Sequence, residues 1–436
     1  MSNQSSRRDF LEHTFGVAAA TGLLGHLSTE EALADPRPVP RAAAPAAVGQ
    51  GEALQIGIIG TGGMGTGHVD AFLRLARDQN EAVRIEALAD VCQPRLEAAS
   101  KKVEEAQGAP PATFGRYTDL LARQDLHAVL IASPEHWHAK MAEDAVAAGK
   151  DVYVEKPMTL HLKDALRLLD VQHTNPSTII NVGTQFVTIS SYREAQRLIA
   201  EGAIGKPVWS QTSYCRNSKD GEWLYYGIDP AWEPGVNLDW EAWCGPSGKA
   251  KWNPEVYARW RRYKRYSTGI IGDLLVHRIT PLVMALDAGW PIRVIASGGH
   301  YVDKAMENHD QVNLTIEFEG EHTMIVAGST ANELGLETVI RGHKGNLYVG
   351  GRNAVLRPER LYTDELDERT FVGEDHGDDQ DELRRQWLRA IRTRTPTAST
   401  VELGTKVMVI VDLAARSMWE GGAFGYDPTT RKVKRL

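Results

Sequence analysis

Cysteine is scarce in this chain of 436 residues, which contains only Cys92, Cys215 and Cys244. No two of them have C-x-x-C spacing, so we expect neither a disulfide framework nor a structural zinc site, and we assign no metal ligands. A single bridge between Cys215 and Cys244 stays open, with buried free thiols as the favoured state.

Excess positive charge and long apolar runs are missing as well. The 49 lysines and arginines are outnumbered by 57 aspartates and glutamates, and no basic stripe with interleaved aromatics occurs, which argues against a nucleic-acid partner. The weakly apolar run 15–27 is too short to be a permanent membrane span. The composition, 42% hydrophobic and 24% charged, is that of an ordinary globular protein, and the length suits two domains.

The first 34 residues have the pattern of an export signal. Arg7 and Arg8, within S-R-R-D-F-L, resemble the twin-arginine motif, and Ala32-Leu33-Ala34 offers a cleavage site after the apolar run. We therefore predict a twin-arginine signal peptide over residues 1–34, export by the Tat machinery, and a place in the periplasm or cell envelope. An accidental arginine pair on a disordered tail is the alternative. Residues 35–53 are rich in proline and alanine and are predicted to be a flexible linker.

A glycine-rich turn, G-x-G-x-x-G, stands between an apolar run, 56–59, and an amphipathic stretch, 68–77. This order predicts a buried strand, a phosphate-binding turn and a helix. Gly60 permits the tight turn, Gly62 lets backbone approach a pyrophosphate, and Gly65 lets helix and strand pack closely. The free N–H groups of the helix N-terminus favour an anion there. The context favours dinucleotide binding over a plain turn, with contacts from Gly60, Gly62, Gly63, Met64 and Gly65.

An acid ends the next predicted strand, residues 84–90. Asp90 follows the glycine turn at about the spacing of the carboxylate that bonds the ribose hydroxyls of a dinucleotide. A carboxylate there would repel a 2′-phosphate, so we predict NAD as the cofactor and regard NADP as less favoured. An ordinary strand-end aspartate is the alternative.

Strands and helices then alternate, with strands at 128–132 and 151–154 and helices at 94–107 and 139–148. This order predicts a doubly wound parallel sheet of the Rossmann type, in which ligands bind at the carboxyl ends of the strands. The loop residues at those ends that we assign to the cofactor are Ser133, Pro134, His136, His138, Glu155, Lys156 and Pro157. For the two histidines a structural role in the loop is equally expected.

These motifs together resemble the Gfo/Idh/MocA family, the group of glucose–fructose oxidoreductase and inositol dehydrogenase. The resemblance rests on the glycine turn, on S-P-x-H-x-H at 133–138, and above all on Glu155-Lys156-Pro157. It implies a dinucleotide-binding domain, predicted here as residues 54–175, and a C-terminal α/β domain with a large, mostly antiparallel sheet, residues 176–436. It also implies that Lys156 lies beside the nicotinamide, that Pro157 follows a cis bond, and that dimers or tetramers cover the open sheet.

An aspartate and a histidine four residues apart, Asp273 and His277, share one face if residues 269–277 are helical. The pair resembles the family's D-x-x-x-H motif, which implies that both residues face substrate and nicotinamide. Leu275 stands where the family often has glycine, and Thr280 where a second acid is common. A structural pair on a helix is the alternative.

Residues 216–265 form a long irregular segment with six tryptophans. Such segments are uncommon unless they are functional or disordered. The aromatics suit stacking on a sugar, and we assign Arg216 and Tyr225 to substrate binding together with Lys156, Asp273 and His277. Packing of the segment on its own aromatics, or on a neighbouring subunit, is equally expected.

The rest of the chain predicts an antiparallel sheet. Alternating runs separated by glycine-containing turns predict strands at 292–300, 309–318, 322–329, 335–342 and 345–349. Two helices close the chain, at about 379–394 and 401–419.

The chemistry we predict is hydride transfer from a hydroxyl of a sugar or sugar derivative to NAD. His277 takes the hydroxyl proton, assisted by Lys156, and Asp273 orients the substrate or His277. An exported enzyme meets no pool of free NAD, so we expect tightly bound, internally recycled NAD. A redox glycosidase, which oxidises, eliminates, hydrates and re-reduces, is the alternative. A non-catalytic NAD- or sugar-binding protein is the third. No motif specifies the sugar, its oxidised carbon or the acceptor.

Overall fold

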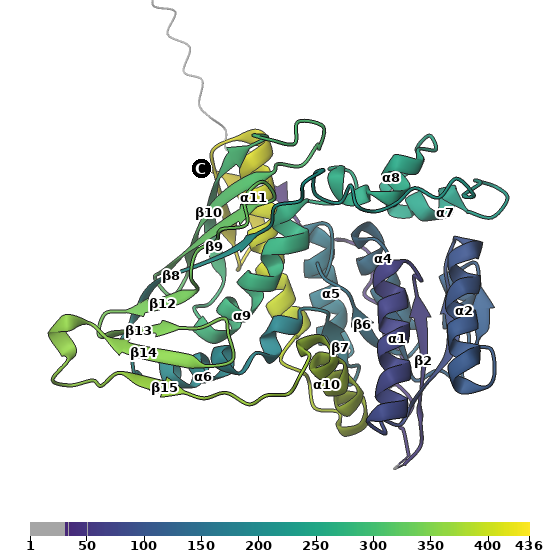
Figure 1. Ribbon diagram of the computed structural model, residues 1–436, viewed down its shortest axis with the longest axis horizontal. Coiled ribbons are helices and arrows are strands. Elements are labelled where there is room, and N and C mark those ends of the chain that lie inside the picture. The colour runs from purple at the N-terminus through teal and green to yellow at the C-terminus, as the bar shows by residue number, and fades with distance from the viewer. Residues whose placement is uncertain (1–30, 34, 50) are drawn as a thin grey trace, which may run out of the picture.

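The computed structural model describes residues 31–33, 35–49 and 51–436 (Figure 1). The arginine pair and the apolar run of the predicted export signal lie outside these residues. Across the described part of the chain, no helix is long and apolar enough to cross a membrane.

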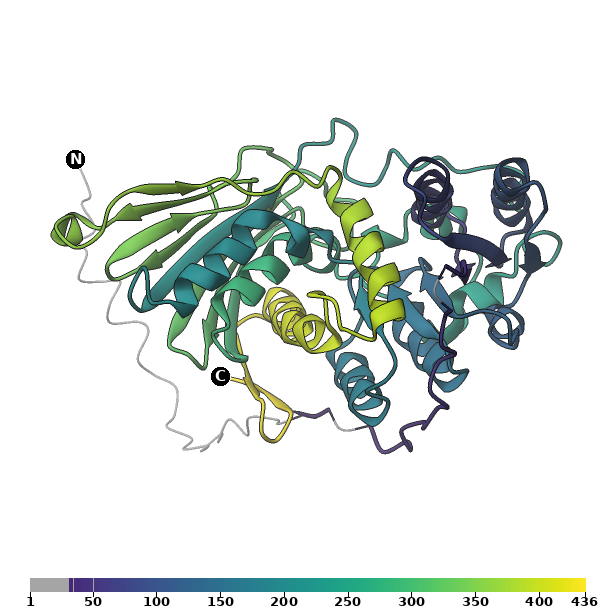
Figure 2. The same cartoon turned by 90° about the horizontal axis from the view of Figure 1, so that it is seen from below.

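The first domain is a six-stranded sheet in the order β4-β3-β2-β5-β6-β7, with every neighbouring pair parallel. Figure 2 shows helices on both faces of this sheet, so the predicted Rossmann architecture is confirmed. The strands are β2 (Leu54–Ile59), β3 (Val83–Ala89), β4 (Ala112–Phe114), β5 (Ala128–Ile131), β6 (Asp151–Val154) and β7 (Ile180–Val182). The helices are α1 (Gly63–Asp78), α2 (Gln93–Gln107), α3 (Tyr117–Leu121), α4 (Glu135–Ala147) and α5 (Leu162–Thr174).

The domain boundary differs from the prediction at residue 175. Strand β7 pairs with β6 in the parallel sheet, so the first domain runs through Val182. The strands β5 and β6 are buried at every residue, as expected for central parallel strands covered on both faces. The short β4 and α3 carry too few residues for a periodic pattern, and the sequence did not predict them.

The second domain is built on an eleven-stranded sheet in the order β1-β17-β16-β9-β10-β11-β8-β12-β13-β14-β15. Only β8 and β11 pair in parallel, so the predicted mostly antiparallel sheet is confirmed. Its strands are β1 (Glu31–Ala32), β8 (Pro207–Cys215), β9 (Pro291–Gly299), β10 (Gln311–Phe318), β11 (His322–Ser329), β12 (Val339–Gly342), β13 (Gly345–Tyr348), β14 (Ala354–Pro358), β15 (Arg369–Phe371), β16 (Ala423–Asp427) and β17 (Lys432–Arg435).

Helices cover one face of this sheet, and the other face is open. The sheet packs against α6 (Ser190–Ala200), α9 (Val276–Leu286) and α11 (Val401–Glu420), while α10 (Asp379–Thr393) reaches the first domain. Along β10 the burial alternates, with Leu314 and Ile316 in the core. Ile295 and Ile325 point to the open face and are 39% and 38% exposed. An antiparallel sheet tolerates such a one-sided arrangement because its residues alternate between faces.

The segment predicted as a flexible linker is docked on the protein. The Arg167 guanidinium donates to the carbonyls of Arg37 and Pro38, and Asn175 holds Pro40 and Ala42. Strand β1, at the end of the predicted signal, pairs with β17. Proline and alanine carry no polar side chain, so composition alone suggested a loose chain. The side chains that fix it come from α5 and its C-cap, far away in the sequence.

The tryptophan-rich segment 216–265 folds over the first domain, and we call it the cover (Figure 1). It contains the short helices α7 (Trp240–Cys244) and α8 (Pro254–Ala258) and the 3-10 turns η2 (Gly245–Ser247) and η3 (Trp260–Arg262). Backbone bonds from Gln93 to Asn237 and from Asp239 to Val91 fasten it to the first domain. The rings of Trp240 and Trp243 are stacked, with their centroids 4.7 Å apart, within an aromatic cluster of the cover. The cover therefore packs on its own aromatics and on the dinucleotide-binding domain.

Candidate active site

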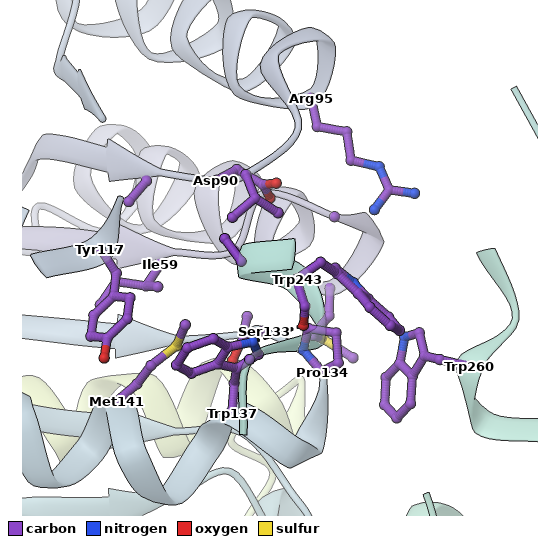
Figure 3. A pocket seen from close by; sticks show the side chains of 18 of the residues that line it. Ile59, Asp90, Arg95, Tyr117, Ser133, Pro134, Trp137, Met141, Trp243 and Trp260 are labelled. Carbon is purple, nitrogen blue, oxygen red and sulfur yellow. Dashed lines mark hydrogen bonds between the residues drawn. The ribbon is translucent and has the colours of Figure 1, made fainter. Parts of the chain in front are cut away.

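A cavity of about 840 Å³ lies between the cover and the carboxyl ends of the parallel strands (Figure 3). This is the edge of the sheet at which the sequence predicts the cofactor. The predicted cofactor residues that line it are Gly60, Gly62, Gly63, Met64, Asp90, Ser133, Pro134, His138, Glu155 and Lys156. Gly65, His136 and Pro157 lie behind this lining.

The glycine turn leaves a cradle that side chains would fill. Gly60 has a φ of +89°, and a Cβ there would lie 2.8 Å from the backbone of Ala132. A Cβ on Gly65 would collide with the Gly60 carbonyl oxygen. At Gly62, in contrast, a Cβ would meet only the Arg95 guanidinium, at 3.5 Å, which is an ordinary contact. Helix α1 begins at Gly63 without a side-chain cap, so its first N–H groups face the cavity free for phosphate oxygens. The turn therefore fits the pyrophosphate of a dinucleotide.

Asp90 has a second role that its position in the sequence did not show. Its Oδ2 accepts a hydrogen bond from the Thr61 backbone N–H at 2.6 Å, and its Oδ1 accepts one from Cys92. The carboxylate therefore fixes the glycine turn and also lines the cavity at the ribose end. Arg95 lies beside it in Figure 3, with its guanidinium 4.7 Å from the ring centroid of Tyr257.

Glu155 follows the last residue of β6, and its carboxylate accepts hydrogen bonds that fix the end of this strand. His68 Nδ1 accepts from the Arg384 guanidinium at 3.0 Å, so the proton of the neutral ring is on Nε2, which donates to Glu155 Oε1 at 2.8 Å. The other carboxylate oxygen accepts from the Lys156 backbone N–H. Burial would raise the pKa of Glu155, but His68 and Lys156 hold it below its ordinary value. The predicted cis bond before Pro157 is present.

The two loop histidines are structural contacts in this molecule. His136 Nε2 bonds the Trp243 carbonyl at 2.8 Å and does not line the cavity, which is the structural role that the sequence left open; its contact with the cofactor stays a prediction. The ring nitrogens of His138 face the carbonyls of Ser133 and Pro157 at 2.8 and 2.7 Å. Burial lowers the pKa of His138, and a neutral ring donates to only one of these carbonyls. The ring thereby joins the two cofactor loops.

Three charged side chains from separate segments meet at the other end of the cavity. Lys156 Nζ donates to the Asp273 carbonyl at 2.8 Å and to Asp273 Oδ1 at 2.9 Å. Arg261 Nε donates to the same Oδ1 at 2.8 Å. Burial would raise the pKa of Asp273, but Arg261 and Lys156 hold it far below its usual range. Asp273 is thus a fixed anion that positions Lys156, and no hydrogen bond joins it to His277 among the contacts described.

His277 is a buried, neutral imidazole behind this cluster. Burial, with Lys156 nearby, lowers its pKa to about 3. Its ring lies 5.8 Å from that of Tyr214 and 5.5 Å from that of Phe186, centroid to centroid. Its Nδ1 has no hydrogen-bond partner among the described residues. The predicted helix around the pair is a π-helix over Ile270–Leu275 that continues as α9, a wider turn that periodicity alone does not distinguish.

The predicted substrate contacts Arg216 and Tyr225 surround a buried glutamate. Arg216 and the Tyr225 hydroxyl both bond Glu222 Oε1 at 3.0 Å, and Arg216 also bonds the Tyr214 hydroxyl at 3.0 Å. Neither residue lines the cavity. Arg216 therefore supports Tyr214, which in turn packs against His277, and direct substrate contact by Arg216 and Tyr225 stays a prediction.

Four residues at the site were not assigned to it individually from the sequence, although the tryptophans of the cover and the pair Arg261-Arg262 were expected to suit a sugar. Trp137, Trp243 and Trp260 line the cavity (Figure 3), and Arg261 of the cover lines it as well. The Arg261 guanidinium lies 4.1 Å from the Trp260 ring centroid, as in a cation–π contact. Their concentration in one aromatic segment was a signal for the segment, but not for the individual residues. The three cysteines are free thiols, so the open alternative of a Cys215–Cys244 bridge is excluded.

Comparison with known proteins agrees with this geometry. The model of an oxidoreductase family with an NAD-binding Rossmann fold matches residues 54–183, and the model of the C-terminal alpha/beta domain of that family matches residues 247–424. The chain belongs to the Gfo/Idh/MocA oxidoreductase family. It is therefore an NAD(P)-dependent oxidoreductase by family, and its first domain is the NAD-binding domain.

Among curated relatives, the chain is similar to proteins of glycosyl hydrolase family 109. One from Shewanella sp. (strain ANA-3) is 36% identical over 172 residues, covering 38% of this chain and 36% of the relative. An alpha-N-acetylgalactosaminidase of Shewanella oneidensis is 26% identical over 193 residues, covering 40% of each chain. The chain thus matches well under two thirds of the length of these relatives.

Solved structures show the same fold. A levoglucosan dehydrogenase in complex with NADH and levoglucosan superposes with a TM-score of 0.65 at 18% identity, covering 86% of this chain and 99% of the other. An NAD-binding oxidoreductase from Klebsiella pneumoniae has a TM-score of 0.62 at 21% identity, covering 88% and 99%.

Proposed function

We propose that the protein oxidises a hydroxyl of a sugar or sugar derivative by hydride transfer to NAD held in the cavity. The observation that carries the proposal is the meeting of Lys156, Asp273 and Arg261 at one end of a cavity whose other end is the glycine cradle. Such an arrangement combines a dinucleotide site with positioned proton-transfer groups.

The side chains have separate parts in this chemistry. When bound, NAD supplies the hydride acceptor. Asp273 accepts two hydrogen bonds from the Lys156 ammonium, at its carbonyl and at Oδ1, and so holds Lys156 in place with one N–H left for the substrate. His277 is neutral at every physiological pH, as a proton acceptor must be. Trp243 and Trp260 of the cover line the cavity, and aromatic walls of this kind limit the access of water to the reacting atoms.

We infer further that the NAD stays bound through successive turnovers. The cover is fastened to the first domain by backbone hydrogen bonds at residues 91–93 and by His136 and Trp137, which both bond the Trp243 carbonyl. Release of a dinucleotide from under it requires these contacts to open. The twin-arginine pattern supports the same inference, because we propose export of the folded, loaded protein to the periplasm or cell envelope, where free NAD is scarce.

A redox glycosidase is the second candidate. The resemblance to glycosyl hydrolase family 109 proteins favours it, as does a retained cofactor, since oxidation and re-reduction within one turnover need no exchange. In that reaction the ketone formed first acidifies the neighbouring C–H, the glycosidic oxygen leaves, water adds, and the ketone is reduced again. A non-catalytic sugar-binding role is disfavoured by the intact Lys156, Asp273 and His277.

We propose a homo-oligomer that covers the open face of the large sheet. Ile295 on β9 and Ile325 on β11 are exposed apolar side chains on that face, at either side of Thr315 of β10. Exposed apolar side chains gathered on one face favour a protein interface.

A glycoside panel distinguishes the candidates. Protein purified without added cofactor is incubated with sugars and with aryl glycosides, and NADH absorbance, oxidised sugar and free aglycone are measured. Oxidised sugar identifies a sugar oxidoreductase, with steady NADH release if the cofactor exchanges. Free aglycone without net NADH identifies the redox glycosidase. Lys156→Met must lower turnover by about 10²–10⁴-fold in either case, and turnover unchanged by this substitution would contradict the proposal.

A further inference from the structure

A buried glutamate behind the reactive cluster has no place in the chemistry described so far. Glu135 is the first residue of α4, and its side chain is almost wholly buried, at 1% residue exposure. Neither of its carboxyl oxygens has a hydrogen-bond partner within the described part of the chain. An unpartnered buried carboxyl is costly, and such groups call for a functional explanation.

The surroundings of Glu135 connect it to the charged cluster. A Cβ on Gly272 would lie 3.5 Å from Glu135 Oε2 and would collide with the Thr268 hydroxyl, which is also buried and unpartnered. Gly272 precedes Asp273 in the π-helix. Glu135 follows β5 and Lys156 follows the neighbouring β6, so both lie at the same edge of the sheet. The titratable and charged groups that act on Glu135 are Lys156, Arg261 and Asp273, with His136 and His138 on its own helix.

The charge of Glu135 is finely balanced. Burial raises the pKa of Glu135 to about 8, Asp273 raises it further, and Ser267, Arg261 and Lys156 lower it. With Glu135 neutral, the three charged groups that act on it, Lys156, Arg261 and Asp273, together carry a net positive charge. A cationic nicotinamide at the Lys156 end would add a further positive charge and favour the ionised carboxylate. NADH, which lacks that charge, would favour the protonated acid.

The proposed redox chemistry needs a proton acceptor of this kind. Oxidation of a hydroxyl breaks its C–H and O–H bonds: the hydride leaves to NAD, giving NADH, and the proton leaves to the protein. With a pKa of about 3, His277 accepts this proton in passing but does not hold it at neutral pH. If the bound cofactor is reoxidised in the same turnover, the same proton is needed again to form the new hydroxyl.

We propose that Glu135 is the proton store of the redox cycle, acting through Lys156. It receives the proton released when the hydroxyl is oxidised and returns it when the bound NADH is reoxidised. The proposal rests on the proposed function, since it requires bound NAD that cycles. Glu135 is a positioning residue, because it does not line the cavity.

Infrared difference spectroscopy tests the store without any substrate. Protein loaded with NAD is compared with protein loaded with NADH at the same neutral pH, and the C=O stretch of a protonated carboxylic acid is measured. The expected result is a protonated carboxyl band in the NADH form that is absent from the NAD form. Glu135→Gln should lose this difference, and Glu135→Asp should restore a shifted band, which also covers the case in which the glutamine variant folds poorly.

Asp151 supplies the matched control. It is another buried carboxyl whose pKa burial raises, to about 6, but it is paired with Arg394 at the amino end of β6. Asp151→Asn should leave the NADH-dependent band unchanged. A second readout is turnover, for which Glu135→Gln should lower kcat about 100-fold with little change in KM.

Two failures are distinguishable. If neither nucleotide binds, the proposed function is wrong, whatever the state of Glu135. If both nucleotides bind and the band is the same in the two forms, or persists in Glu135→Gln, the store is overturned while the oxidoreductase assignment stands.

Discussion

The two ends of the cavity are built on different principles. The phosphate end comes from one continuous stretch, 60–65, and acts through backbone shape and unpaired N–H groups. The reactive end joins Lys156, Arg261 and Asp273, which are far apart in the sequence or lie on irregular segments, and it acts through charge. The first end should therefore be sensitive to added atoms, and the second to lost charge. This difference orders the following predictions.

The largest effect is expected at the phosphate end. Gly65→Ala places a methyl group against the Gly60 carbonyl, and overpacking against backbone costs about 3 kcal/mol or more of unfolding free energy. We expect loss of bound NAD and a lower midpoint of denaturation. Gly67→Ala in the same helix is the control, since a Cβ there meets nothing within 4 Å and should stabilise the protein by about 0.5–1 kcal/mol. Equal behaviour of the two variants would contradict the steric account.

Loss of charge at the reactive end should leave the cofactor in place. Lys156→Met is expected to lower kcat by about 10²–10⁴-fold, the usual contribution of a proton-transfer group, with bound NAD unchanged. Lys101→Met on the exposed face of α2 is the control and should leave kcat unaltered. Loss of NAD from the Lys156 variant would show that the two ends are not separate.

The cover should govern how long NAD stays bound. Trp243→Ala removes a buried side chain that stacks on Trp240 and packs against His136, and such truncations cost about 3–5 kcal/mol. If this substitution also destabilises the cover in its position over the cavity, we expect NAD to dissociate at least about tenfold faster. Trp290→Ala, at a half-buried tryptophan that contacts Lys406 and Tyr426 outside the cover, is the control. The rate of NAD release from the wild type and from each variant is measured by competition with a fluorescent nucleotide analogue. An unchanged rate in Trp243→Ala would show that the cover does not retain the cofactor.

The pH dependence of turnover should not show the titration of a histidine with an ordinary pKa. Because burial lowers the pKa of His277 to about 3, its neutral form persists as pH falls through 6.5, and kcat should stay level there. A pH–rate profile of the wild type and of His277→Gln checks this. An acid limb near pH 6.5 that disappears in the variant would mean that His277 is solvated and not buried.

The last prediction concerns stability. Burial raises the pKa of Glu135 from its ordinary 4.5 to about 8, so the folded state keeps a proton that the unfolded state loses. The contribution of the protonated Glu135 to the free energy of unfolding is complete below pH 4.5 and is lost progressively as pH rises toward 8. The free energy of unfolding, measured with urea, should fall for the wild type relative to Glu135→Gln as pH rises through this range. A flat difference would mean that Glu135 is ionised when folded.

Sequence reasoning succeeded where structure is local. The glycine turn, Asp90 and the Glu155-Lys156-Pro157 loop were placed correctly because each follows a strand of clear apolar pattern, and parallel strands bring their carboxyl ends together. The Asp273/His277 pair was found through its spacing and resemblance, although its π-helical geometry was not.

The residues that were missed depend on distant partners. Arg261 contacts Asp273 only because the cover bends back over the first domain, which no periodicity predicts. From the sequence, Glu135 is expected to be an ordinary exposed acid in the first turn of a helix, where a carboxylate is favourable. Its burial comes from the second domain. The docked segment 35–49 was misjudged for the same reason, since Arg167 and Asn175 hold it from α5 and its C-cap.

The most direct test of the central claim is the nucleotide content of the protein itself. Protein purified without added cofactor is denatured, and the released nucleotide is identified and quantified by chromatography and mass spectrometry. The account predicts close to one NAD or NADH per chain. Protein that carries no nucleotide, yet binds and releases added NAD rapidly, would contradict a cofactor that is retained and recycled under the cover.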